Sequence, residues 1–339
     1  MRQFSVTFYF FLVLVAPVPL CAQNQTAPET EDEVVRVDTA LVTVPVSVKN
    51  RNGGFIPNLR REDFRIFEDD VEQEISFFET ADKPFTVALL LDVSDSMKIK
   101  LNEIQEAAIA FIEQLRPNER VIVVVFAKQI VTLTDATDDR KVLFEAIRRA
   151  QTGGGTSLYD AIETVINQHL HRVAGRKAIV ILTDGVDTSS TRATFESSLR
   201  RADELNGLIY PIQYQGYEDI TAKQFGAANS HLGATIYTTP SGEPILAAYE
   251  RGTRYLRMLA SNSGGRFYYA DKAKNLVRAF TQIAEELRQQ YSLGYYPKNQ
   301  TSERAKRRIK VRVNVSEGIV RARDSYTYTS QPPPKEKQQ

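Results

Sequence analysis

A single cysteine, Cys21, is present among the 339 residues, and it lies in an N-terminal stretch typical of a secretory signal peptide. That stretch has a positive charge at Arg2, an apolar run over residues 8–15 and a small residue, Ala22, at the expected cleavage site. Cleavage after Ala22 would leave a mature chain without cysteine, which excludes disulfides and cysteine-ligated metals as sources of stability. We therefore expect a secreted or periplasmic protein whose own apolar core keeps it folded.

Apolar runs long enough to cross a membrane comfortably are also missing from the N-terminus. The run over 8–15 is short, and Pro17 and Pro19 follow it. A membrane anchor is therefore the less favoured interpretation, and we expect no transmembrane anchor after signal cleavage.

An excess of one charge is absent as well. Lys and Arg together number 43 and Asp and Glu 42, giving a formal net charge of +1. No global field then attracts nucleic acid, and we expect no nucleic-acid partner. One local run over 304–312 is basic, but such a run is more typical of a solvated strand face than of an anion-binding surface. Its basic residues are Arg304, Lys306, Arg307, Arg308, Lys310 and Arg312.

The segment 34–83 has the pattern of β-strands. Valines alternate with polar residues or proline over 42–48, and Pro45 within this run favours an edge strand. A second pair of strands is expected near Phe64–Phe67 and Glu74–Phe78, on either side of an acidic turn. The preceding residues 23–33 are polar and acidic, and we expect a flexible linker there.

The pattern changes at Pro84 to strands buried on both faces, separated by amphipathic helices. Continuous apolar runs occur at 85–91, 121–126, 178–182 and 208–212. This alternation predicts βαβ units in a doubly wound, mainly parallel sheet of the Rossmann-like α/β class over 84–290. Residues 215–250 are less regular and are expected to form an insertion loop, before a last strand at 266–269 and a helix at 273–290.

Strand patterns return after that helix, at Ser292–Tyr296 and at Ile309–Val315. Each flank has too few strands to be stable alone, so we expect 291–328 to pair with 34–83 in one smaller β-rich domain. The last residues, 329–339, are expected to be a disordered tail. With the signal peptide at 1–22, these segments account for the whole chain.

Oxygen-bearing side chains follow the first buried strand at alternate positions. Asp92, Ser94 and Ser96 come directly after it, Thr156 follows a run of three glycines, and Asp184 follows the third buried strand. Parallel strands of an open sheet present their carboxyl ends at one edge, where ligands bind, so we expect these residues to converge. Two carboxylates and three hydroxyls form an all-oxygen set that suits Mg²⁺ or Mn²⁺ and suits zinc poorly.

The three motifs DVSDS, GGGTSLYDAI and LTDG, in this order between buried strands, resemble the metal-ion-dependent adhesion site of von Willebrand factor A-type domains. The resemblance covers about 84–290, and it implies that the five residues named above hold one metal ion. The flanking sequences VTVPVSVKNRNGGFIPNLRREDFRIFEDDVEQEISFF and YSLGYYP, with RRIKVRVNV, resemble the exported VWFA-related family described from Acidobacteria. Lys98 and Lys100 next to the first motif argue against a second, neighbouring cation.

These residues predict a non-catalytic binding module. Water would complete the metal shell, and an Asp or Glu of a partner protein could replace a water and bind the ion directly. Two alternatives stay open: a metal-dependent hydrolase, and a structural exported domain without a ligand. The hydrolase is less favoured because the predicted site has no His or Lys to act as a base and the sequence has no GxSxG or HExxH motif.

Overall fold

The computed structural model describes residues 41–214, 238–299 and 305–327, all within one compact unit. The predicted signal peptide and linker, most of the predicted insertion loop, Arg304 and the predicted tail lie outside the described residues.

A six-stranded sheet forms the centre of the α/β part, in the order β10-β9-β8-β5-β6-β7. The first five strands in this order are parallel, and β7 pairs antiparallel with β6 at the edge. The bounds are β5 (Phe85–Asp92), β6 (Arg120–Phe126), β7 (Ile130–Thr137), β8 (Arg176–Thr183), β9 (Leu208–Tyr214) and β10 (Tyr268–Ala270). The predicted mainly parallel α/β fold is therefore confirmed, although β7 was not among the predicted strands.

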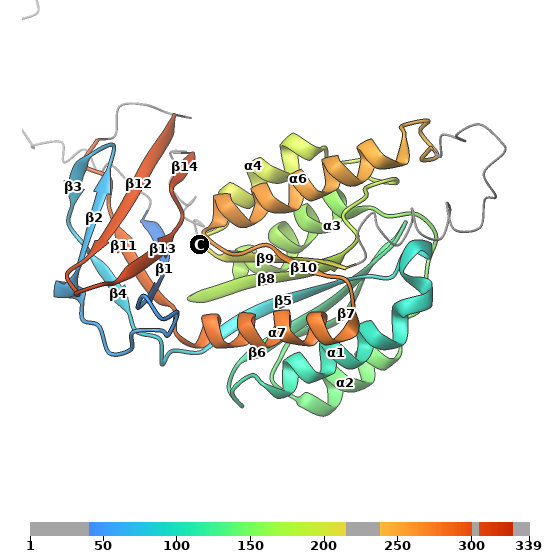
Figure 1. Cartoon of the computed structure of the whole chain (residues 1–339), viewed down its shortest axis with the longest axis horizontal. Helices are drawn as coiled ribbons and strands as arrows, with labels where there is room; N and C mark the ends of the chain where they lie inside the picture. The colour runs from blue at the N-terminus through green and yellow to red at the C-terminus, as the bar shows by residue number, and fades with distance from the viewer. Residues whose placement is uncertain (1–40, 215–237, 300–304, 328–339) are drawn as a thin grey trace, which may run out of the picture. The chain divides into compact units, whose positions relative to one another are not determined.

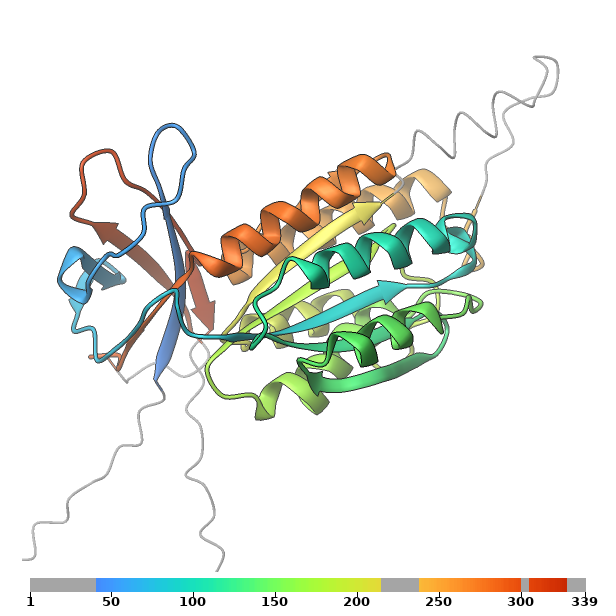
Figure 2. The same ribbon diagram turned by 90° about the horizontal axis from the view of Figure 1, so that it is seen from below.

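Helices cover both faces of this sheet, as Figures 1 and 2 show. One face packs against α1 (Leu101–Glu113), α2 (Arg140–Arg148) and α7 (Ala273–Arg288). The other packs against α3 (Leu158–Thr164), α4 (Phe195–Asp203) and α6 (Ile245–Ser263). Every residue of β5 is buried because each face of the strand meets a helical layer, which explains its uninterrupted apolar sequence.

The two flanks of the chain form a smaller β part, made of two four-stranded sheets. One sheet has the order β13-β1-β11-β4 and the other the order β14-β12-β2-β3, so each contains strands from both flanks. Their side chains share one apolar core. The bounds are β1 (Val42–Lys49), β2 (Phe64–Glu68), β3 (Val71–Gln73), β4 (Phe77–Glu79), β11 (Tyr291–Tyr295), β12 (Lys306–Val313), β13 (Ile319–Ala322) and β14 (Ser325–Thr327).

Two details of the β part differ from the sequence predictions. The partner of β2 in its hairpin is β3, and β4 belongs to the other sheet. The segment Glu74–Phe78 was therefore assigned to the wrong partner. The strand β1 is internal, because it pairs with both β11 and β13. Pro45 is tolerated there because β13 pairs only with 46–49, so that on the β13 side no ladder hydrogen bond is required of it.

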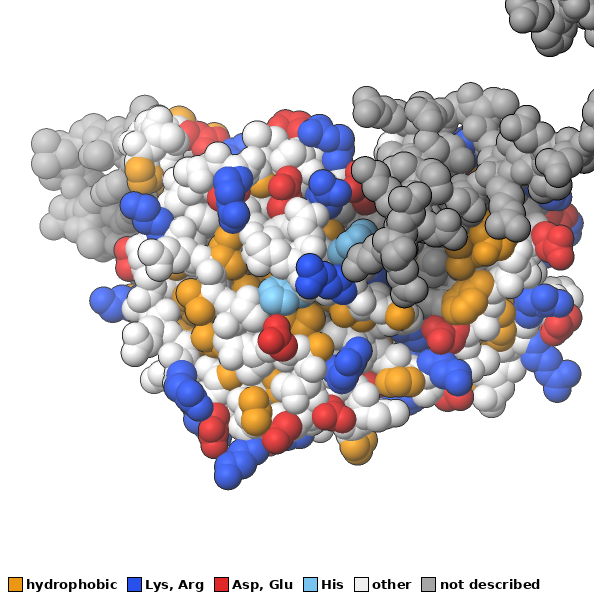
Figure 3. Space-filling model, turned by 180° about the vertical axis from the view of Figure 1, so that it is seen from behind, with side chains coloured by type: hydrophobic (Ala, Val, Ile, Leu, Met, Phe, Trp, Pro, Cys, Tyr) orange, Lys and Arg blue, Asp and Glu red, His pale blue; other side chains and the backbone are white. Residues whose placement is uncertain are grey.

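An ion pair lies buried in the core of the β part. The Arg307 guanidinium donates to Glu68 at 2.7 Å, and the hydroxyls of Tyr295 and Tyr326 donate to the same carboxylate at 2.7 Å each. Arg307 is only 3% exposed, so its assignment to a solvated strand face was wrong. Its described neighbours in the basic run of β12 are exposed, because alternate residues of the strand point to solvent. On the face of the molecule in Figure 3, basic and acidic side chains are interspersed.

Candidate metal centre

The sheet fold brings the ends of β5 and β8 together at its carboxyl edge. The two strands pair in parallel register up to Leu91 and Leu182, so Asp92 and the Thr183-Asp184 turn are neighbours. The loop after β5 runs through Ser94 into the short 3-10 helix of 95–100.

Both aspartates are buried and hold fixed positions through hydrogen bonds. Asp92 is 0% exposed; its Oδ1 accepts from the Ser94 N–H at 2.9 Å, and its Oδ2 accepts from the Thr183 hydroxyl at 2.6 Å. Asp184 is 3% exposed; its Oδ1 accepts from the Val186 N–H at 3.0 Å. The two carboxylates therefore come from separate loops, and each is fixed by its own turn.

Serine hydroxyls connect the two loops. The Ser96 hydroxyl donates to Asp184 Oδ2 at 2.7 Å, and the hydroxyls of Ser94 and Ser96 are 3.1 Å apart. Ser94 is buried, whereas Ser96 is exposed. The structure thus brings four of the five predicted site residues into one hydrogen-bonded group with an open side toward solvent.

Thr156 lies in a third loop, whose backbone contacts both the loop after β5 and the loop after β8. Its carbonyl accepts from the N–H groups of Thr188 and Ser189, each at 2.9 Å, and the Gly153 N–H donates to the Val93 carbonyl at 2.9 Å. Among the described residues, no hydrogen bond joins the Thr156 hydroxyl to the other four site residues. The loop is therefore adjacent to the site, and the structure does not place this hydroxyl in the hydrogen-bonded group.

The site carries uncompensated negative charge. Burial and the charge of Asp184 raise the pKa of Asp92 to about 7, and burial also raises the pKa of Asp184. No Lys, Arg or His within the described residues forms an ion pair with either carboxylate. Burial of two neighbouring carboxylates without a cation is costly, and a bound cation would remove that cost.

The donor chemistry of the group fits a hard divalent cation. Two carboxylates and the serine hydroxyls offer only oxygen, which Mg²⁺ and Mn²⁺ prefer. In the described part of the chain, no group of three or more His, Cys, Asp or Glu side chains is arranged to hold a metal, so the hydroxyls are needed to complete a protein ligand set. Such a set leaves room for water, as Mg²⁺ sites usually do.

Three residues that support the site were not found from the sequence. The Thr183 hydroxyl orients Asp92, the Tyr249 hydroxyl lies 3.4 Å from Asp184 Oδ2, and the Gln213 amide donates to the Asp184 carbonyl at 2.9 Å. Gln213 and Tyr249 come from β9 and α6, which have no motif in common with the metal loops. Only their position in the fold reveals them.

A close backbone contact fixes α6 against the Asp184 turn. Gly185 has a left-handed φ of 91°, and a Cβ on Gly252 of α6 would lie 2.3 Å from the Gly185 carbonyl oxygen. Only glycine permits this approach, which brings Tyr249, one turn earlier on the helix, to Asp184.

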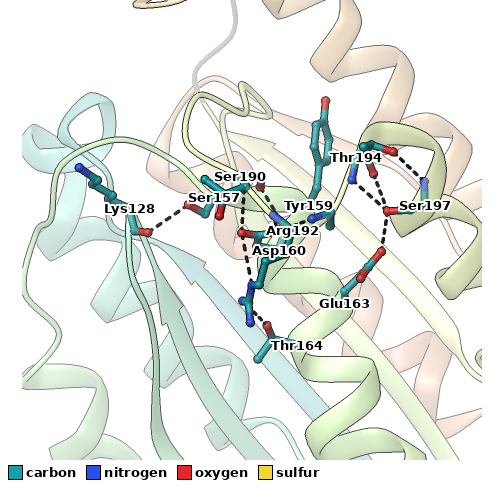
Figure 4. Close-up of polar contacts among 12 residues, drawn as sticks. Lys128, Ser157, Tyr159, Asp160, Glu163, Thr164, Ser190, Arg192, Thr194 and Ser197 are labelled. Atoms are coloured by element: carbon teal, nitrogen blue, oxygen red, sulfur yellow. Dashed lines mark hydrogen bonds and ion pairs between the residues drawn. The ribbon is translucent and has the colours of Figure 1, made fainter.

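A second polar network orders the loop after Asp184 (Figure 4). Asp160 at the start of α3 accepts from three successive backbone N–H groups, those of residues 191–193. Burial raises the pKa of Asp160, but these hydrogen bonds outweigh it and hold that pKa below its ordinary value. Asp187 accepts from the Tyr159 N–H at 3.1 Å and from the Ser190 hydroxyl at 2.5 Å. Asp187 is half-buried, whereas Asp95 in the loop after β5 is exposed.

The mainly parallel sheet with helices on both faces places this part of the chain in the Rossmann-like α/β class. Residues 87–186 match the family model described as the von Willebrand factor type A domain. The chain therefore carries such a domain, and the match spans β5 to the Asp184 turn.

The chain is also similar to other proteins in sequence and in structure. The chain is 29% identical over 147 residues to an uncharacterized protein of Borreliella burgdorferi, and this match covers 40% of the chain and 42% of that protein. Less than half the length of this relative is therefore spanned. A von Willebrand factor type A protein from Catenulispora acidiphila has a TM-score of 0.47 at 11% identity, covering 86% of this chain and 75% of that one.

A pilus protein has a similar structure. The vWF domain of the type V pilus tip protein Mfa5 from Porphyromonas gingivalis has a TM-score of 0.45 at 14% identity, covering 60% of this chain and 94% of that one.

Within the described residues of the present chain, no helix combines the length and apolarity that a membrane span requires.

Proposed function

We propose that the chain is a non-catalytic binding module that holds one divalent cation, Mg²⁺ or Mn²⁺. Asp92, Ser94, Ser96, Thr156 and Asp184 would be its ligands, directly or through water. The observation that carries this proposal is the pair of buried carboxylates, linked by two serine hydroxyls and without a cationic side chain. A divalent ion supplies the charge that the protein itself does not.

The ion would bind an acidic side chain of a partner protein. Only Asp92 and Asp184 offset its charge, because the hydroxyl ligands are neutral. Ser96 is exposed, so the open side of the site faces solvent. A carboxylate from an Asp or Glu of the partner can replace a water there, and the resulting bond depends on the metal.

The surroundings of the carboxylates favour binding over hydrolysis. The Tyr249 hydroxyl lies 3.4 Å from Asp184 Oδ2, and burial raises the pKa of Tyr249 above its ordinary value, so it stays protonated at neutral pH and cannot act as a general base. No described His or Lys contacts either carboxylate. The predicted signal peptide would place this module in the periplasm or outside the cell, where millimolar Mg²⁺ can occupy a weak site.

Calorimetry with metal alone tests the first step. Titration of MgCl₂ or MnCl₂ into the wild-type protein should show one site, and Asp184→Asn should abolish it. Asp95→Asn is the matched control, because it removes the same charge from an exposed position in the same loop and should retain the site. Absence of binding at millimolar metal would reject the site and favour a structural domain without a ligand. Metal-dependent turnover of a phosphate ester or peptide that Asp92→Asn abolishes would favour the hydrolase.

A further inference from the structure

A groove of about 1040 Å³ follows α6 from the part of the helix that is nearest the candidate metal centre. Gln213 and Tyr249 line it, and both also contact Asp184. These two buried side chains lie between the groove and the Asp184 turn, so one end of the groove is next to the candidate metal centre. One of its walls is α6, and the other is the segment 265–269 that leads into β10.

The length of the groove can be estimated from the helix. Its lining residues extend along α6 from Leu246 to Ser261, which at 1.5 Å per residue is about 22 Å. An extended chain at about 3.3 Å per residue would need about seven residues to cover that length. The groove is thus long enough to hold a linear peptide segment.

The edge of the sheet also favours an extended segment. Among the described residues β10 is an edge strand whose only partner is β9. Addition of a strand to the edge of a sheet is a common mode of peptide recognition. Tyr269 in this strand is 47% exposed and lines the groove.

The lining combines basic and apolar side chains. Among the described lining residues, four are arginines and one is a glutamate, Glu250, and the large apolar residues include Met258 at 36% and Leu246 at 42% exposure. One of the four arginines is partly neutralised, because Arg266 lies 3.8 Å from the buried Glu286. The excess positive charge remains and complements an acidic ligand. The arginines are Arg254, Arg257, Arg266 and Arg321.

We propose that this groove binds the residues next to the metal-binding carboxylate of the partner, and that the partner presents them as an extended acidic and apolar segment. This inference rests on the proposed function, because the metal ion fixes one end of the segment. Arg254 and Arg257 lie five and eight residues beyond Tyr249 on α6, which is about 8 and 12 Å along the helix. A second acidic side chain is therefore expected about two to four residues from the carboxylate that binds the metal.

A peptide selection tests this specificity. Random linear peptides of twelve residues are selected on the full-length wild-type protein in 5 mM MgCl₂, and the tightest enriched peptide becomes the probe. We expect enriched peptides to carry an Asp or Glu with a second one two to four positions away and an apolar residue nearby. Their binding should be lost in EDTA.

A double charge reversal then separates the groove from the metal site. Arg254→Glu with Arg257→Glu should weaken probe binding at least tenfold while leaving Mg²⁺ binding by calorimetry unchanged. The control is Lys274→Glu with Arg278→Glu, which makes the same charge change at exposed positions of α7 on the opposite face of the sheet. It should leave probe binding within twofold of wild type.

Several outcomes would overturn the groove proposal without touching the metal proposal. One is Mg²⁺-dependent probe binding that the Arg254 and Arg257 reversals do not weaken, and another is the absence of enriched peptides although Mg²⁺ binds. A third is a concentration-dependent dimer that the same reversals dissociate, since the groove would then bind a second copy. Failure of Mg²⁺ to bind wild type rejects the proposed function itself, and peptide binding in EDTA that the reversals abolish would show a groove independent of metal.

Discussion

The variant Asp92→Asn separates a metal-binding role from a structural one, because the two roles predict opposite changes in stability. Without metal, Asp92 and Asp184 are buried neighbours with like charge, and the asparagine removes one charge. Its amide keeps the shape of the carboxylate: the oxygen can accept from the Ser94 N–H, and the nitrogen can donate to the Thr183 hydroxyl. In EDTA, the variant should therefore be as stable as wild type or more stable.

Added metal should reverse this order. A ligand that binds only the folded state stabilises it by RT ln(1 + [L]/Kd). For a dissociation constant of about 0.1 to 1 mM, typical of weak divalent sites, 10 mM Mg²⁺ contributes about 1.4 to 2.7 kcal/mol. Wild type should gain this amount, and Asp92→Asn should gain close to nothing because its site has lost half of its negative charge.

Urea denaturation followed by circular dichroism at pH 7.5 measures both effects. Each protein is unfolded in 1 mM EDTA and in 10 mM MgCl₂, with Asp95→Asn as the control that should gain as much as wild type. Equal gains in wild type and Asp92→Asn would refute the assignment of Asp92 as a ligand. A large loss of stability for Asp92→Asn in EDTA would instead identify the carboxylate as structural.

Three other substitutions test the supporting structure. Asp160→Asn should lower the free energy of unfolding by about 2 kcal/mol at pH 7, because charge-assisted hydrogen bonds to three backbone N–H groups are weakened. Since the pKa of Asp160 is lowered in the folded state, this difference should be fully present above about pH 4 and shrink as the pH falls through that lower pKa. A difference that stays constant in urea denaturation down to pH 3 would contradict this prediction. Gly252→Ala should destabilise the protein by about 1 to 3 kcal/mol, because the alanine Cβ would meet the Gly185 carbonyl, even though alanine is favoured over glycine in helices by about 1 kcal/mol. A stabilised variant that still binds Mg²⁺ normally would disprove that contact. Arg307→Met should cost about 3 to 5 kcal/mol by leaving Glu68 buried without its partner, whereas an unchanged melting curve would show that the ion pair contributes nothing.

The α/β architecture was predictable because burial on both faces leaves a strong mark in the sequence. The run over 85–91 is apolar at almost every position, and each neighbouring parallel strand shows the same feature. The strand β7 leaves no such mark. It lies at the edge of the sheet with every residue exposed or half-buried, and its sequence IVTLTDAT lacks the continuous apolar run of the central strands. Its antiparallel pairing with β6 is a tertiary property that local periodicity does not reveal.

The candidate site also contains residues that were predictable from the sequence and residues that were not. Asp92, Ser94, Ser96 and Asp184 were predictable because they follow buried strands whose carboxyl ends must meet at one edge. Tyr249 was not predictable, because its approach to Asp184 depends on the contact between Gly252 and Gly185 across two distant segments. The burial of Arg307 was equally hidden from the sequence, because the other described members of its basic run face solvent.

The occupancy of the site by a metal is tested most directly by a crystal structure of the protein grown with MnCl₂, using anomalous scattering at the manganese edge. The account predicts one anomalous peak among Asp92, Ser94, Ser96, Thr156 and Asp184, about 2.1 Å from the oxygens that coordinate it directly, with water on its open side. It also predicts that Asp184→Asn crystals lack the peak. A well-ordered site without manganese at 10 mM MnCl₂, or a peak held by other residues, would contradict the assignment.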